Sequence, residues 1–294
     1  MTIGTGGVTG VYYPAGQAIA TMVNAQQDTY HIKASAEATG GSVYNINAVL
    51  SGDLDFGIAQ SDRGHQAWHG LADWEGDPQT RLRSVFSLHP EIVTLVAAED
   101  SGIRELDDLR GKRVNIGNPG SGHRGNATDA LRTAGIDPET DLSAQSLKAA
   151  DAPKMLQDGR IDAFFYTVGH PNGAINEATA GKRTVRFVPI TGMGQLLQEA
   201  PYYSTATIPV AKYPRVANTN DVESIGMVTT FLTSDAVSEE AVYSLTKEVV
   251  SQIDEFRTLH PALESLTPAG MLEGLTAPIH PGAERCFREL GLLP

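Results

Sequence analysis

The sequence predicts an α/β fold built as two similar lobes. Short strand-like apolar stretches alternate with helical stretches, a pattern typical of parallel sheets covered by helices. Each half of the chain opens with a glycine-rich turn between a strand and a helix, at 4–10 and at 117–125. With 294 residues, 41% of them hydrophobic and 19% charged, the chain is long enough for one large or two medium cores.

The first lobe begins with a strand at 2–5, a turn at 6–10 and a helix from about Pro14, a residue favoured in first helical turns. Gly52 is expected to end a second helix, since glycine readily closes helices. The other elements follow from alternation or apolar spacing: a helix at 40–52 and strands at 30–36, 55–60, 83–89 and 91–98.

The second lobe repeats this order of elements. A strand at 113–117 leads into the second glycine-rich turn and its helix. A further helix from residue 152 is stopped by Gly159 and followed by a strand that runs to 167. The segments 48–58 and 154–166 share a helix end, a glycine and a strand, which indicates two related lobes; chance recurrence of common βα segments is the alternative interpretation.

The last third of the chain predicts a return to the first lobe. A buried strand at 223–233 precedes an amphipathic helix at 238–259 with Ser238 as N-cap. We therefore expect lobe one to comprise residues 1–94 plus 226–294 and lobe two to comprise 95–225. Two linking strands would join the lobes. A small ligand is expected to bind in the cleft between them, and the cleft is expected to close on binding.

Composition excludes several classes of function. The 35 acidic and 22 basic residues give a net charge of −13, which argues against nucleic acid as a partner. No apolar run is long enough to span a membrane. The single Cys286 excludes an internal disulfide. The turn at 4–10 does not fit a dinucleotide fingerprint, and the turn at 117–125 is not a Walker A loop. We expect no cofactor.

The turn at 117–125 predicts an anion-binding site. Unpaired amides at a helix N-terminus carry partial positive charge, and glycine lets a ligand approach the backbone. Ser121 would add a hydroxyl donor beside Gly122. Arg124 lies in the first helical turn, where a cation is electrostatically unfavourable, so it is expected to face a carboxylate. A solvated surface arginine is the alternative.

Other candidate ligand contacts lie at strand ends and helix starts. Tyr166, Thr167 and His170 lie at the C-terminal end of a predicted strand. The first lobe offers Gly6, Tyr13, Ser42 and Gln60, although Tyr12 is an alternative to Tyr13. His65 and His69 have the spacing of a metal pair, but a surface helix explains them better because no third ligand accompanies them. We expect no metal site.

Four ordered motifs resemble the TAXI family of extracytoplasmic solute receptors, which serve TRAP-type secondary transporters. They are TGGVTGVYYPAGQAIA, ATGGSVYNINAVLSGDLDFGIAQSD, VNIGNPGSGHRGNA and DGRIDAFFYTVGHPNGAI, with PYYSTATIPVAKYP at 201–214 following in order. The resemblance implies a periplasmic-binding-protein type II fold with hinge strands, a periplasmic location and delivery of the solute to TRAP membrane subunits. It also implies that Met1 stands where an export signal was trimmed. The residues alone leave a cytoplasmic location as the alternative.

Receptors of this family are associated mainly with glutamate and related acids. Here the usual GSG-T loop is replaced by Gly122-His123-Arg124-Gly125, and Arg124 favours a second carboxylate, as in 2-oxoglutarate or a C4 acid. We therefore expect a monomeric, non-catalytic receptor for a small carboxylate; an enzyme acting on a small acidic metabolite is the alternative. The expected ligand contacts are Gly6, Tyr13, Ser42, Gln60, Ser121, Gly122, Arg124, Gly125, Asn126, Tyr166, Thr167 and His170.

Overall fold

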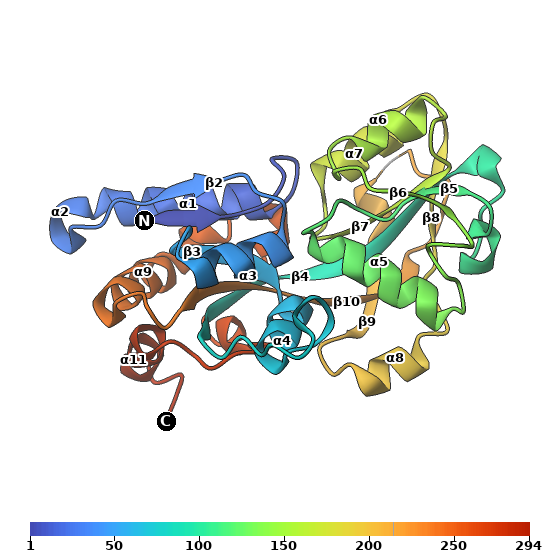
Figure 1. Cartoon of the computed structure of the whole chain (residues 1–294). Helices are drawn as coiled ribbons and strands as arrows, with labels where there is room; N and C mark the ends of the chain where they lie inside the picture. The colour runs from blue at the N-terminus through green and yellow to red at the C-terminus, as the bar shows by residue number, and fades with distance from the viewer. Residues whose placement is uncertain (214) are drawn as a thin grey trace. The chain divides into compact units, whose positions relative to one another are not determined.

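The protein has an α/β architecture, shown in Figure 1 by a computed structural model that describes residues 1–213 and 215–294. The final residue of the 201–214 motif therefore lies outside the described part. Two compact units are present: unit 1 comprises Met1–His89 and Val228–Pro294, and unit 2 comprises Pro90–Met227. The sequence predicts the boundaries between the two lobes at 94/95 and 225/226, whereas the units meet at 89/90 and 227/228.

Unit 1 contains a sheet whose parallel part is formed by three strands. The central strand β1 pairs in parallel with β2 and β3, and β10 pairs antiparallel with β3. The elements of unit 1 are β1 (Thr2–Gly4), α1 (Tyr12–Ala25), α2 (Gln27–Tyr30), β2 (Ser35–Glu37), α3 (Ser42–Ser51), β3 (Phe56–Gln60), α4 (Ser61–His69), α9 (Glu239–Ser251), α10 (Ile253–Phe256) and α11 (Pro281–Glu289), with parts of β4 (Leu82–Ala98) and β10 (Val222–Ser234).

Unit 2 has a corresponding arrangement. Strand β5 pairs in parallel with β6 and β7, and β7 and β8 pair antiparallel with β4. The elements of unit 2 are β5 (Arg113–Asn115), α5 (Gly122–Thr133), β6 (Ser143–Gln145), α6 (Ala152–Gln157), β7 (Ala163–Val168), α7 (Gly173–Ala180), β8 (Val185–Val188), α8 (Gly194–Glu199) and β9 (Ser204–Ile208), with the rest of β4 and β10.

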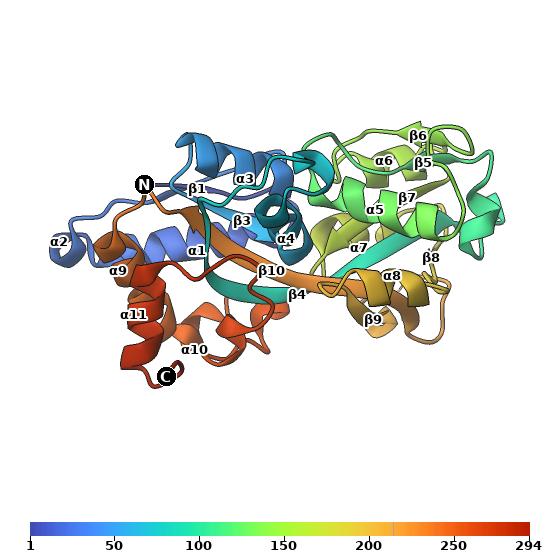
Figure 2. The same ribbon diagram turned by 60° about the horizontal axis from the view of Figure 1, so that its bottom comes forward.

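The sheet is mixed, which corrects the prediction of a parallel sheet. The strands β1, β2 and β3 of unit 1 and β5, β6 and β7 of unit 2 are parallel as predicted, because helices connect them. Strands β4 and β10 each pass from one unit to the other without a crossover helix, and both run antiparallel to their neighbours (Figure 2).

Strand β4 corrects a second prediction, since residues 83–89 and 91–98 form one strand of 17 residues. Pro90 lies in the middle of this strand and is solvent-exposed, whereas Glu91 is buried. A proline is tolerated in a strand where its missing N–H is not needed for pairing. The pairing of β4 with β7 begins at Ile92, after Pro90.

Two element ends also differ from the predictions. Strand β2 begins at Ser35, because Tyr30 ends the short helix α2 and His31 takes a left-handed conformation with φ 54°. The predicted helix at 238–259 ends at Ser251. The Ser251 hydroxyl donates to the Glu248 carbonyl oxygen, which offers that oxygen a partner other than the helix backbone.

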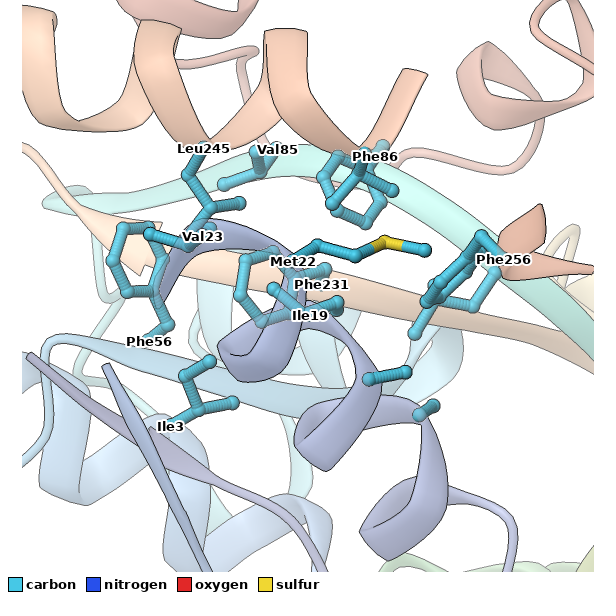
Figure 3. Close-up of a cluster of buried hydrophobic side chains, with 14 of the residues drawn as sticks. Ile3, Ile19, Met22, Val23, Phe56, Val85, Phe86, Phe231, Leu245 and Phe256 are labelled. Atoms are coloured by element: carbon cyan, nitrogen blue, oxygen red, sulfur yellow. The ribbon is translucent and has the colours of Figure 1, made fainter. Parts of the chain in front are cut away.

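Each unit has its own hydrophobic core. In unit 1, α1 and α9 bury an apolar face against the sheet, so that Ile19, Val23 and Leu245 surround the stacked rings of Phe56 and Phe231 (Figure 3). In unit 2, the buried cluster includes β4, β7 and one face of α5. This packing fixes α5 against the strands and so positions its N-terminal turn.

Candidate functional site

The N-terminal turn of α5 lies where the predicted anion site was placed. Its N-cap, Ser121, has extended torsions, but the Ser121 side chain makes no capping hydrogen bond to this helix. The Ser121 hydroxyl instead donates to the Asn118 carbonyl oxygen at 2.6 Å. Because the first amides of a helix have no intrahelical acceptor, the buried residues Gly122 and His123 present backbone donors at this end.

Gly117 packs directly against the start of α5. Its φ of +105° lies in the region that favours glycine, and a Cβ atom there would collide with the imidazole ring of His123. The buried Asn115 supports the turn: its Oδ1 accepts from the Gly117 amide at 3.3 Å and from the Leu147 amide at 2.8 Å. Asn115 was not among the predicted site residues, although an Asn at the end of a strand beside a glycine-rich turn is a signal for it.

Arg124 is in the first turn of α5, as predicted, and braces the glycine-rich turn. Its guanidinium Nη1 donates to the Gly117 carbonyl oxygen at 3.0 Å and to the Ser146 hydroxyl at 2.8 Å. The side chain is half-buried. Contact between Arg124 and a solute carboxylate therefore stays a prediction, and the contacts seen are within unit 2.

His123 is buried beside Tyr166, and the two rings meet edge to face with centroids 5.4 Å apart. Burial, helped by the nearby Arg124 charge, lowers the pKa of His123 to about 4, so the imidazole is neutral at physiological pH. His123 was not among the predicted ligand contacts. Its position in the motif, directly before Arg124, was the available signal.

Tyr166 is also buried and stays protonated. Burial, followed by the negative charge of Glu91, raises its pKa above the ordinary value, and a hydrogen bond with the Asn172 side chain acts in the opposite direction. Glu91 is itself buried in β4. The side of the turn nearest Tyr166 therefore contains a neutral phenol and a neutral imidazole, with an acidic side chain close by.

Thr167 and His170 have different environments. Thr167 is buried, and its hydroxyl has no hydrogen-bond partner within the part of the chain that the structure describes. Both ring nitrogens of His170 are used inside unit 2: Nε2 pairs with the Thr94 hydroxyl at 3.0 Å and Nδ1 with the Tyr213 hydroxyl at 2.6 Å. Burial lowers the pKa of His170 to about 3, so it serves here as a neutral connector of the fold.

Gly125 and Asn126 complete the first turns of α5. Gly125 is half-buried, whereas Asn126 is fully buried and donates through Nδ2 to the Tyr203 hydroxyl at 2.7 Å. The same Tyr203 hydroxyl donates to the Asp129 carboxylate at 2.8 Å. This amide nitrogen anchors α5 to the segment around Tyr203, and a role of Asn126 in holding a carboxylate stays a prediction.

Unit 1 brings two of the predicted contacts together. The Gln60 amide, at the end of β3, donates to the Ser42 hydroxyl at the start of α3 at 3.2 Å, and both residues are buried. Gly6 is buried near the Tyr12 ring, while the half-buried Tyr13 accepts from the Gln17 amide group at 3.1 Å. Ligand contacts at these residues stay predictions.

The histidine pair on α4 is half-buried at His65 and exposed at His69. The two rings stack with centroids 4.1 Å apart. Burial, followed by the charge of His69, lowers the pKa of His65. Among the described residues, no group of three or more His, Cys, Asp or Glu side chains could hold a metal ion.

The first turn of α4 contains an ion pair that the sequence analysis did not foresee. The Arg63 guanidinium donates to the Asp62 carboxylate through Nε at 3.1 Å and Nη2 at 3.0 Å, and both side chains are buried. Adjacent Asp and Arg residues are common on exposed helices, so burial of both could not be read from the sequence.

Solved structures with the same fold are periplasmic binding proteins and their relatives. A protein of Bordetella bronchiseptica RB50 matches with a TM-score of 0.61 at 15% identity, covering 99% of this chain and 97% of that one. MatC from Rhodopseudomonas palustris, solved with bound malate, matches with 0.59 at 14% identity, covering 99% and 96%. The periplasmic aliphatic sulphonate binding protein SsuA from Escherichia coli matches with 0.50 at 18% identity, covering 100% and 83%.

At these identities the likeness establishes the fold, which is that of the periplasmic binding proteins. The chain belongs to the NMT1-like family, whose sequence pattern matches residues 3–291. Both units therefore belong to the family domain. In the described part of the chain, no helix has the length and apolar character needed to cross a bilayer.

Proposed function

We propose that this protein is a solute receptor that binds a small carboxylate at the N-terminal turn of α5. The observation that carries the proposal is the start of this helix, where the Ser121 hydroxyl donates to the Asn118 carbonyl oxygen and does not cap the helix amides. Backbone amides at a helix N-terminus bind anions through hydrogen bonds and through the helix dipole. The net charge of −13 does not oppose this, because distant charges are screened beyond ~10 Å.

The proposed setting is a TRAP transporter of the TAXI type. Four ordered motifs support it, since they resemble TAXI receptors along nearly the whole chain. The similar solved structures support only the binding of an anionic solute, because SsuA is a periplasmic sulphonate-binding protein and MatC was solved with malate. In this proposal the protein resides in the periplasm, acts as a monomer and delivers its solute to TRAP membrane subunits.

Glutamate and dicarboxylates such as 2-oxoglutarate are the solutes favoured by the resemblance and by Arg124. Within unit 2, however, the Arg124 guanidinium already donates to Gly117 and Ser146. We therefore assign the carboxylate to the α5 amides and propose that Arg124 acts first as a brace of the turn. Whether the solute carries a second carboxylate is tested by comparing monocarboxylates with dicarboxylates in the binding assay.

The enzymatic alternative is weaker. His170 was the histidine expected near the ligand, but its two nitrogens are bonded to Thr94 and Tyr213, and its pKa of about 3 makes it a poor base at neutral pH. A receptor needs no general base, because it only binds and releases its solute.

A proline at the first position of α5 tests the proposal. Gly122→Pro removes one amide donor, and proline is well tolerated at that helical position after an extended residue such as Ser121. Isothermal titration calorimetry with a panel of small carboxylates and their neutral amides should show binding of carboxylates alone. The Gly122→Pro variant should bind at least ~10-fold more weakly, because a charge-assisted hydrogen bond contributes about 1.5–3 kcal/mol.

Gly173→Pro is the matched control, because Gly173 is the first residue of α7 in the same unit. The α7 helix is capped by the Asn172 side chain, which accepts from the Ile175 amide at 3.2 Å. This control should bind as the wild type does. Equal affinity of the wild type and Gly122→Pro, or binding of the neutral amides in preference to the acids, would contradict the proposal.

A further inference from the structure

Gly117 is held on both sides by side chains of unit 2. Its amide N–H donates to Oδ1 of Asn115 at 3.3 Å, and its carbonyl oxygen accepts from Nη1 of Arg124 at 3.0 Å. Glycine loses more conformational freedom on folding than any other residue, and the φ of Gly117 is +105°. The two peptide groups that flank its Cα atom are therefore fixed by side chains at a residue type whose backbone has the most freedom.

The same two side chains also bind the segment that follows β6. Oδ1 of Asn115 accepts from the Leu147 amide at 2.8 Å, and Nδ2 of Asn115 donates to the Leu147 carbonyl oxygen at 3.3 Å. Nη1 of Arg124 donates to the Ser146 hydroxyl at 2.8 Å. This nitrogen carries two hydrogens, one for Gly117 and one for Ser146. Asn115 and Arg124 thus form two links between the glycine-rich turn and the segment after β6.

The two links differ in their exposure to solvent. Asn115 is fully buried, whereas Arg124 is half-buried and Ser146 is exposed. Hydrogen bonds from a charged donor are stronger than neutral ones, so Arg124 can hold its acceptors even where water competes for them. An exposed serine hydroxyl can be removed without leaving a buried polar group unpaired. A substitution at Ser146 therefore tests the link while the protein stays folded.

The turn held in this way leads directly to the amides that are proposed to bind the carboxylate. The carbonyl oxygen of Asn118 accepts from the amide of Ser121 at 3.2 Å and from its hydroxyl at 2.6 Å. Ser121 is the N-cap of α5, and Gly122 begins the helix. The ring of His123 lies against Gly117, because a Cβ atom at Gly117 would collide with it. The backbone of the turn and the His123 ring thus connect Gly117 to the first amides of α5.

Donors that are already ordered bind an anion more tightly than mobile ones. If the turn became ordered only when the solute binds, the loss of conformational entropy would reduce the binding free energy. The bonds of Arg124 also give a physical reason for its position. A cation is unfavourable in the first turn of a helix, and the two acceptors at Gly117 and Ser146 offset that effect.

We propose that Asn115, Arg124 and Ser146, here called the Gly117 clamp, set the affinity of the carboxylate site by fixing the glycine-rich turn. Ser146 is then a positioning residue, which acts on the solute only through Arg124 and Gly117. This inference rests on the proposed function and extends the site to residues that support the binding amides. Because the clamp acts on the turn, its loss should weaken monocarboxylates and dicarboxylates by the same factor.

Isothermal titration calorimetry of Ser146→Ala tests the inference, with acetate, succinate, glutamate and 2-oxoglutarate as probes. Every acid that binds the wild type should bind this variant at least ~3-fold more weakly, because ordering of the turn then opposes binding. Ser146→Thr keeps a hydroxyl and should restore the wild-type affinity. Ser143→Ala is the control and should bind as the wild type does, because Ser143 is exposed and its hydroxyl accepts from the Gln145 side chain at 3.4 Å.

Two further measurements separate positioning from a general loss of structure. The urea midpoint of Ser146→Ala at pH 7 should equal that of the wild type, since Ser146 is exposed, while the Gly117 amide of the solute-free variant should exchange its hydrogen faster. The double variant of Arg124→Ala and Ser146→Ala should bind as tightly as Arg124→Ala alone, because Ser146 acts through Arg124.

The outcomes distinguish this inference from the proposed function. An unchanged affinity in Ser146→Ala, an equal loss in Ser143→Ala, or a loss confined to dicarboxylates would overturn the inference, even if Gly122→Pro still weakens carboxylate binding. If none of the four acids binds the wild type, the proposed carboxylate site fails and the inference fails with it. A loss in Ser146→Ala that is common to every acid that binds, and that Ser146→Thr restores, would support both.

Discussion

Acidification should destabilise the protein through His123. In the folded chain burial holds the pKa of this imidazole at about 4, against an ordinary value of 6.5 in the unfolded chain. The unfolded chain therefore takes up the proton first, so the contribution of neutral His123 to stability is complete above pH 6.5 and decreases as the pH falls from 6.5 towards 4. At pH 5 the loss is about 2 kcal/mol, since each pKa unit corresponds to about 1.36 kcal/mol.

Urea unfolding at pH 7 and pH 5, followed by far-UV circular dichroism, measures this loss. Other buried histidines, such as His170, add to the total in the wild type, so the informative quantity is the difference between the wild type and His123→Asn. The variant cannot be protonated at this position and should lose about 2 kcal/mol less between the two pH values. Tryptophan fluorescence alone would not suffice, because Trp68 and Trp74 both lie in unit 1.

His31→Asn is the control for this experiment. His31 is exposed and has a left-handed conformation that asparagine tolerates. This variant should retain the full wild-type pH dependence. If His123→Asn instead loses as much stability as the wild type, His123 is not buried as a neutral imidazole, and the description of the α5 turn is wrong.

Three other substitutions should have effects of distinct size, each measured by urea unfolding at pH 7. Gly117→Ala forces a Cβ into the His123 ring at a positive φ and should cost at least ~1–2 kcal/mol; no loss would mean that the ring does not lie there. Arg63→Ala leaves the Asp62 carboxylate buried without this partner and should cost ~3–5 kcal/mol, whereas a loss below ~1 kcal/mol would indicate a solvated pair. Tyr203→Phe removes a hydroxyl that links two residues of α5 and should cost ~1–3 kcal/mol, and an unchanged midpoint would refute that link.

The sequence predicted well those features that depend on local pattern. The start of α5 follows from the order of strand, glycines and helix, and the positions of Gly122 and Arg124 in the first turn follow from it directly. The Ser238 N-cap is confirmed, since its side chain accepts from the Ala241 amide. Helix starts and caps can be predicted without knowing the contacts of distant residues.

The orientation of side chains in the same turn could not be predicted. His123 and Arg124 are neighbours in one glycine-rich motif, yet His123 is buried against Tyr166 whereas Arg124 bonds to Ser146. Both partners come from elements far along the chain. Likewise His170 follows a strand end as expected, but its ring is hydrogen-bonded to the Tyr213 hydroxyl inside unit 2. Tertiary packing determines the orientation of these side chains, and a local sequence pattern does not show it.

Backbone amide NMR of the ¹⁵N-labelled protein tests the carboxylate site most directly. Titration with a small carboxylate that binds should shift the Gly122 and His123 amides furthest, because they begin α5, while the α7 amides, including Gly173, should hardly move. Saturable shifts at the start of α5, absent with the neutral amide of the same acid, are the predicted result. Shifts confined to other helices, with an unperturbed first turn of α5, would contradict the account.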